Sequence, residues 1–177
     1  PPAVTDVIPA TRADGSPAMS EKALVKLAAA LEKRSEHPLA EAIMTYAGKR
    51  GVVARAVEDF RAIPGRGVTA REGANVIAAG NARLMAELSI PVDEDARDAF
   101  AQQGKTPLFF AKNGALVGTI AVADEVKPTS ADAVRSLERL GIETIMLTGD
   151  NALTARAIAR HVGVSRVVSD VLPQDKE

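Results

Sequence analysis

The segment TIMLTGDN, residues 144–151, decides the fold class of the C-terminal part of the chain. An apolar strand over 144–147 ends in a Thr-Gly turn, and Asn151 can cap the helix that follows. A helix is expected before this strand, over 129–140, and a second short strand over 166–169. Because strands that alternate with helices are typical of a parallel sheet, this region is predicted to be of the doubly wound α/β type.

The preceding part of the chain has a different pattern. Two amphipathic helices are expected first, one that begins after Ser20 and ends near Arg34, and one that begins at Pro38. Pro38 favours extended geometry for the residue before it, which places His37 at the N-cap of the second helix. Short strands then alternate with two further helices, and the Asn-Gly pair at 113–114 predicts a tight hairpin turn.

These patterns predict an α/β protein with two parts. A mixed α/β lobe, with an antiparallel sheet and helices, is expected over residues 11–122. Residues 1–10 and 123–177 are expected to form parts of one doubly wound domain, into which this lobe is inserted.

The composition excludes several classes of function. The chain has 177 residues, 46% of them hydrophobic, and carries 22 Lys+Arg against 23 Asp+Glu, so its net charge of -1 argues against nucleic acid or an anionic membrane as its main partner. No apolar stretch approaches the roughly 20 residues that span a bilayer, so a soluble piece without direct membrane insertion is expected. With no Cys and two His, disulfides, thiolate metal sites and histidine-rich metal sites are excluded.

Two candidate phosphate-binding features lie near the C-terminus. Residues 148–151 combine a Thr hydroxyl, a Gly and a helix N-terminus at the end of a strand, which is where open α/β sheets bind ligands. Such junctions also occur without any ligand. Lys176, in the stretch PQDK at 173–176, offers a point charge for a phosphoryl group or is simply a solvated surface side chain.

A glycine-rich stretch, GRGVTA at 65–70, formally fits a dinucleotide-binding fingerprint. That fingerprint must open a helix, whereas strand-like sequence follows here, so a Rossmann dinucleotide site is rejected. What remains is a loop whose backbone can approach a flat ligand closely, or a plain tight turn.

The junction of the first two helices brings together two polar side chains. Glu32 lies near the end of the first helix and His37 begins the second, so a carboxylate and an imidazole can converge on one face. The positive end of a helix disfavours imidazolium, which leaves a neutral ring suited to stacking on a base or hydrogen bonding to it. The alternative is that His37 only caps the helix.

Five motifs in one order resemble the ATP-binding part of heavy-metal-transporting P-type ATPases: SEHPLA (35–40), GRGV (65–68), AGN (79–81), TGDN (148–151) and PQDK (173–176). The resemblance implies that residues 11–122 are the nucleotide-binding domain. It also implies that 1–10 and 123–177 are parts of an incomplete, Rossmann-type phosphorylation domain of the haloacid-dehalogenase kind.

The same resemblance assigns roles to individual residues. Those implied to face the adenine are Glu32 and His37, and those implied to line or complete the nucleotide cleft are Gly65, Gly67, Val68, Gly80 and Asn81. Those implied to support the phosphorylation site are Thr148, Asp150 and Lys176, while Asp124 and Lys127 would lie near the hinge between the domains.

Two family motifs do not occur in this chain: Asp-Lys-Thr-Gly-Thr, which contains the phosphorylated Asp, and Gly-Asp-Gly-x-Asn-Asp, which supplies a magnesium carboxylate. We therefore expect a fragment that binds ATP or ADP, with Mg²⁺ arriving on the nucleotide, and that does not hydrolyse ATP at a meaningful rate. The resemblance implies a parent pump in a membrane, with this region on the cytoplasmic side and the remaining pump domains as partners.

The transported ion is expected to be copper(I), because SEHPL resembles the copper/silver pumps somewhat more than the zinc/cadmium/lead pumps. A zinc, cadmium or lead pump is the nearest alternative. A free-standing haloacid-dehalogenase-like phosphatase would need an N-terminal Asp-x-Asp, whereas Asp6 is followed by Val7 and Ile8. A non-catalytic module that kept the fold and lost the ligand is the remaining alternative.

Overall fold

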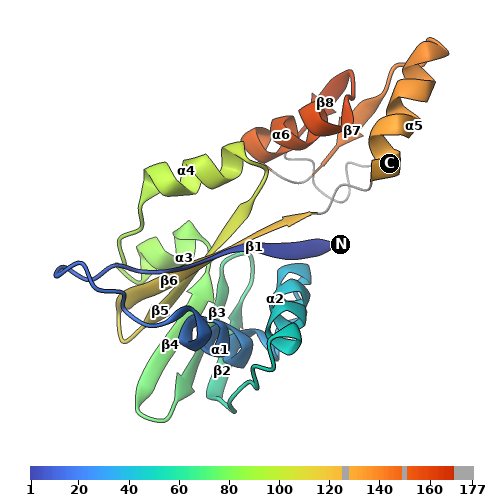
Figure 1. Ribbon diagram of the computed structural model, residues 1–177. Helices are drawn as coiled ribbons and strands as arrows, with labels where there is room; N and C mark the ends of the chain where they lie inside the picture. Colours follow the sequence, from blue (N-terminus) through green and yellow to red (C-terminus); the bar gives the residue numbers. More distant parts are fainter. Residues whose placement is uncertain (125–127, 149–150, 170–177) are drawn as a thin grey trace. The chain divides into compact units, whose positions relative to one another are not determined.

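The computed structural model describes residues 1–124, 128–148 and 151–169 (Figure 1). The chain forms two compact units. The larger unit joins Pro1–Arg97 to Pro107–Ala123, and the smaller unit joins Asp98–Thr106 to the described residues from Asp124 onward. Each unit is considered by itself below.

A six-stranded sheet forms the centre of the larger unit, in the order β1-β6-β5-β4-β3-β2. Its strands are β1 (Pro2–Pro9), β2 (Glu58–Ile63), β3 (Gly67–Glu72), β4 (Asn75–Gly80), β5 (Thr106–Lys112) and β6 (Ala115–Asp124). Strands β2 to β5 pair in antiparallel fashion. The turn between β5 and β6 has positive φ at both Asn113 (51°) and Gly114 (80°), which is the geometry of a tight Asn-Gly hairpin and confirms that prediction.

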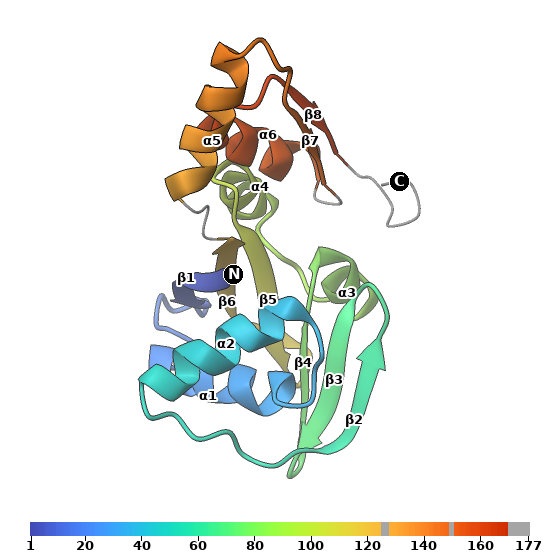
Figure 2. The ribbon, with the colours of Figure 1, turned by 90° about the vertical axis from the view of Figure 1, so that its right-hand side faces the viewer.

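Two amphipathic helices, α1 (Glu21–Glu32) and α2 (Pro38–Lys49), pack against each other, and α1 also contacts β3 and β4 (Figure 2). The Ser20 hydroxyl caps α1 by accepting a hydrogen bond from the Ala23 amide at 3.1 Å. The apolar faces of both helices and one face of the sheet form the main core, whose fully buried side chains include Leu24, Leu31, Ile43, Ile77, Phe110 and Ile120. Two shorter helices, α3 (Ala82–Glu87) and α4 (Glu94–Gln102), follow β4.

The smaller unit contains the strand-helix alternation that the sequence predicts. Its elements are α5 (Pro128–Arg139), β7 (Ile145–Leu147), α6 (Ala152–Val162) and β8 (Arg166–Val168). Strands β7 and β8 pair in parallel, Leu147 opposite Val168, and α6 connects them. The Asn151 side chain caps α6 through the Thr154 amide at 3.0 Å, and Gly163 ends that helix at φ +85°.

The fold class is therefore mixed α/β, with an antiparallel sheet and helices in one unit and a parallel strand pair in the other, as the sequence predicts. Strand β1 lies beside β6 in the larger sheet, and the Ala10 amide donates a hydrogen bond to the Val117 carbonyl at 2.9 Å. In the described residues, no helix is long and apolar enough to cross a bilayer.

Candidate functional site

The first part of the candidate site is the end of α1, where Glu32 is only 7% exposed. Burial raises the pKa of this carboxyl to about 7, because a low-dielectric environment disfavours the charged form, and a hydrogen bond with the Ser35 side chain opposes the shift. Near neutral pH, Glu32 is therefore divided between its charged and neutral forms. Such a group can accept or donate a hydrogen bond to a ligand.

Ser35 connects Glu32 to His37, a link that the sequence reasoning missed. The Ser35 amide donates to the Glu32 carbonyl at 3.0 Å, and the Ser35 hydroxyl accepts a hydrogen bond from the His37 amide at 3.3 Å. A serine side chain often accepts a hydrogen bond from the backbone amide two residues later. The spacing of Ser35 and His37 in the sequence could therefore have predicted this bond.

His37 is the N-cap of α2, as predicted, with extended backbone (φ -71°, ψ 139°) ahead of Pro38. Its Nδ1 atom accepts a hydrogen bond from the Leu39 amide at 3.2 Å. In this arrangement Nδ1 carries no proton, so the neutral ring carries its proton on Nε2. Because His37 is exposed, its Nε2–H group and ring face are available to a ligand.

The second part of the candidate site is the turn between β2 and β3. Gly67 and Gly80 lie opposite each other in the β3–β4 pair. A Cβ on Gly67 would lie 2.0 Å from the Ala79 carbonyl oxygen, and one on Gly80 would lie 2.2 Å from the Arg66 carbonyl oxygen. Both residues are therefore required to be glycine by the close approach of two backbones.

Gly65 has a different environment. Its φ is +71°, and a Cβ placed there would meet nothing within 4 Å. The outer side of this turn is thus open, which leaves space for the close backbone approach of a ligand. Val68 is buried in the main core, so only its backbone can face such a ligand.

The fold brings these two parts of the site onto packed elements of one unit. Helix α1 contacts β3 and β4. Leu31 and Val68, the neighbours of Glu32 and Gly67 in sequence, belong to one buried cluster. Asn81, at the end of β4, is tied to the Gly65 carbonyl by a hydrogen bond of 2.8 Å.

The predicted phosphorylation-site residues are described only in part. Thr148 is buried at the end of β7, and its amide donates to the Val168 carbonyl at 3.0 Å. Asp124 is exposed at the end of β6. Three predicted residues lie outside the described part of the chain: Lys127, Asp150 and Lys176.

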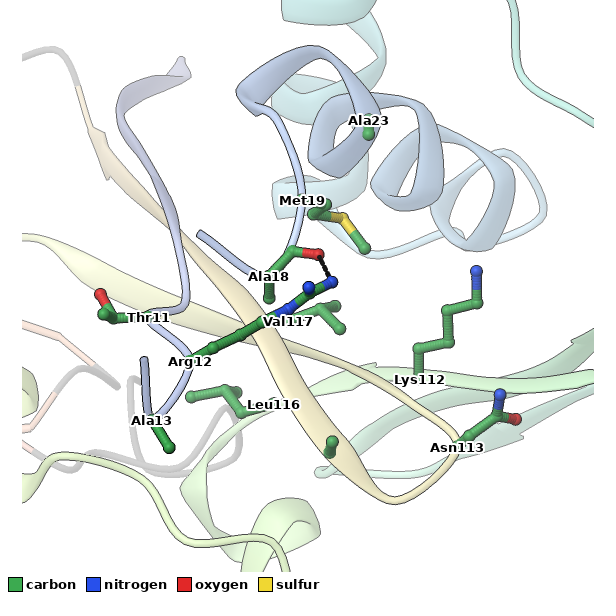
Figure 3. A pocket seen from close by; sticks show the side chains of 11 residues that line it. Thr11, Arg12, Ala13, Ala18, Met19, Ala23, Lys112, Asn113, Leu116 and Val117 are labelled. Carbon is green, nitrogen blue, oxygen red and sulfur yellow. Dashed lines mark hydrogen bonds between the residues drawn. The ribbon is translucent and has the colours of Figure 1, made fainter. Parts of the chain in front are cut away.

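The larger unit also has a cavity of about 700 Å³ beside the β5–β6 hairpin, lined in part by Lys112, Asn113 and Val117 (Figure 3). Figure 3 shows the side chain of Arg12 directed toward Ala18, and its guanidinium donates to the Ala18 carbonyl at 3.0 Å. None of the site residues predicted from the sequence lines this cavity. Within the described ranges, no group of three or more acidic or His side chains could hold a metal ion.

Comparison with known proteins assigns the family. Residues 2–177 match the model of haloacid dehalogenase-like hydrolases. The chain is 43% identical over 155 residues to a copper-exporting P-type ATPase of Staphylococcus aureus (strain USA300 / TCH1516), an alignment that covers 86% of this chain and 19% of that protein. The chain thus spans about a fifth of the length of the curated relatives it matches.

Solved structures of P-type ATPases are also similar to this chain. The structure of a zinc-transporting PIB-type ATPase in the E2.Pi state is 32% identical with a TM-score of 0.76, and the match covers 99% of this chain and 27% of that one. The N-domain of HMA6, a copper-transporting P-type ATPase, is 25% identical with a TM-score of 0.54, over 68% of this chain and 97% of that one. The chain therefore belongs to the haloacid dehalogenase-like hydrolase family, and within it resembles heavy-metal P-type ATPases.

Proposed function

We propose that the chain is the nucleotide-binding domain, with part of the phosphorylation domain, of a P-type ATPase that exports copper(I). The proposed nucleotide-binding domain is residues 11–122, and the proposed parts of the phosphorylation domain are 1–10 and 123–177. The match to the N-domain of HMA6, which covers 68% of this chain and 97% of that domain, supports such a division. The 43% identity to a copper-exporting relative supports copper.

The observation that carries the proposal is the α1–α2 junction, where the exposed imidazole of His37 follows the buried carboxyl of Glu32 by five residues in sequence. The His37 ring offers a stacking face and an Nε2–H donor to a purine. Glu32 offers an acceptor to the exocyclic amino group of adenine, a position at which guanine has a carbonyl oxygen. Adenine nucleotides are therefore expected to bind in preference to guanine nucleotides.

The remaining predicted residues complete the proposed site. Gly65 leaves room for the nucleotide, and the backbones of Gly67, Val68 and Gly80 form the wall behind it, held by Asn81. On the phosphorylation side, the proposed residues are Thr148, Asp150 and Lys176, which would face the phosphate end of ATP in the working pump. Mg²⁺ would arrive with the nucleotide phosphates.

The parent pump would couple ATP hydrolysis, through an aspartyl phosphate, to ion export. This chain does not contain the motif with the phosphorylated Asp. Residues that position the phosphate and neutralise its charge cannot replace the Asp that accepts the phosphoryl group. Phosphate release from Mg²⁺-ATP by this chain is therefore expected to stay at background.

The test is calorimetric titration of the 177-residue chain with ATP, ADP and GTP, repeated on two variants. His37→Asn keeps a good N-cap and removes the imidazole, whereas His37→Ala removes both. We expect ATP to bind at least about tenfold more tightly than GTP, and His37→Asn to weaken the binding of both nucleotides while keeping the parent's unfolding midpoint. Equal affinity for ATP and GTP, or unchanged ATP binding in His37→Asn, would contradict the proposal.

Zinc is the alternative cargo, favoured by the 32% identity to a zinc-transporting ATPase over 99% of this chain. Disruption of the gene that encodes the chain can distinguish between copper and zinc as the exported ion. Greater sensitivity of the host cells to copper than to zinc would support the copper proposal, and the reverse would support a zinc exporter.

A further inference from the structure

Asn81 connects the turn at Gly65–Gly67 to helix α3. The Asn81 amide donates to the Arg66 carbonyl at 2.9 Å, its Nδ2 donates to the Gly65 carbonyl at 2.8 Å, and its Oδ1 accepts from the Leu84 amide at 3.0 Å. Oδ1 and Nδ2 each have a fitting partner, so the orientation of the amide group is determined. One residue thus caps α3 and holds two consecutive carbonyls of the turn.

The packing behind the turn is as close as backbones allow. Gly67 and Gly80 face each other with no room for a Cβ on either. This close approach brings the turn within reach of Asn81, which directly follows Gly80. A Cβ on Gly65 would meet nothing within 4 Å. The turn is therefore packed on the side of Gly80 and leaves space for a ligand at Gly65.

An ion pair adds a second, weaker fastening. Arg66 Nη1 lies 2.7 Å from Glu87 Oε1, at the end of α3, with both side chains about two-fifths exposed (40% and 41%). Exposed pairs of this kind contribute little to stability. Asn81, and not the ion pair, is therefore the main fastening.

We propose that Asn81 is a positioning residue, which holds the Gly65–Gly67 turn in the shape that receives the nucleotide and does not itself contact the nucleotide. This inference rests on the proposed function for its effect on ATP binding. It separates the role of Asn81 from those of Glu32 and His37, which are proposed to contact the base.

The Arg66 amide reports directly on the turn, because it donates to the Ile63 carbonyl at 3.0 Å and closes it. The experiment measures hydrogen exchange at this amide without nucleotide, together with ATP affinity, in the full chain. Asn81→Ser keeps an oxygen that can cap α3 but removes the donor to the Gly65 carbonyl. Glu87→Gln removes only the ion pair.

We expect Asn81→Ser to accelerate exchange at the Arg66 amide by about fivefold or more and to weaken ATP binding by about fivefold, the factor that corresponds to one hydrogen bond. Exchange in the main core should stay unchanged. Glu87→Gln should change either quantity by less than about threefold. Saturating ATP should restore the parent's protection of the Arg66 amide in Asn81→Ser.

Weaker ATP binding with unchanged exchange at Arg66 would mean direct contact and would overturn the inference, as would no change in either quantity. If Asn81→Ser does not fold, Asn81→Asp, which caps helices well and cannot donate, gives the same exchange test. If the parent chain binds no ATP, the proposed function fails, whereas exchange at Arg66 still decides whether Asn81 holds the turn.

Discussion

At the scale of single residues, Glu32 is the unusual group, because it is a carboxyl that the fold buries at a helix end. Its pKa is about 7 in the folded protein, against an ordinary value of 4.5. The folded state therefore holds the Glu32 proton more tightly than the unfolded state does. The stability contributed by the neutral form is fully present below pH 4.5 and is lost as the pH rises through about 7.

Glu32→Gln should remove this pH dependence, because glutamine resembles the neutral acid and does not titrate. Between pH 5 and pH 8, the free energy of unfolding of the variant should rise relative to the parent by up to about 3 kcal/mol. Denaturant unfolding across this pH range measures the difference. Glu36→Gln, at an exposed position four residues away, is the control and should show no such trend. A pH-independent difference for Glu32→Gln would contradict the assignment.

At the scale of elements, the β3–β4 pair depends on two glycines that face each other. Gly67→Ala would place a Cβ 2.0 Å from a backbone oxygen, so strand β3 or β4 must move. Gly73→Ala is a matched control, since Gly73 also has positive φ (+61°) but open space around it.

We expect Gly67→Ala to lower the free energy of unfolding by more than about 3 kcal/mol, and Gly73→Ala by about 1 kcal/mol from backbone strain alone. Chemical denaturation of both variants measures these losses. Equal losses would show that the close approach at Gly67 relaxes easily.

Local signals explain why much of the element structure could be predicted. Ser20, His37 and Asn151 each cap the helix expected after them, because N-cap preferences act within three residues. The turn at Asn113–Gly114 is equally local.

Features set by distant partners could not be predicted. The pairing of β1 with β6 joins segments over a hundred residues apart in sequence, and nothing near β1 specifies that neighbour. Asp59 has φ +51° at a register shift between β2 and β3, a distortion that depends on the partner strand. In the candidate site, the sequence predicted that Glu32 lies near the end of one helix and His37 at the start of the next, but not the burial of Glu32 or the link through Ser35.

At the scale of the whole molecule, the two units differ in how much apolar surface they bury. The larger unit covers its six-stranded sheet with α1 and α2, whereas the two-stranded sheet of the smaller unit leaves Ile145, Leu147 and Val168 substantially exposed. Two-stranded sheets are marginally stable without extensive packing. The units should therefore open independently.

Native-state hydrogen exchange tests this difference. Amides in the β3–β4 ladder should be protected roughly 100-fold more than those in the β7–β8 ladder. Exchange in β7–β8 as slow as in β3–β4 would show instead that the chain opens as one cooperative unit.

The central claim, that this chain binds ATP at the α1–α2 junction and the Gly65–Gly67 turn, is tested most directly by an amide-resolved NMR titration with ATP. We expect saturable shifts at Glu32, Ser35, His37, the turn and Gly80. Shifts confined to the cavity lined by Arg12 and Lys112, or no saturable shift at all, would contradict it.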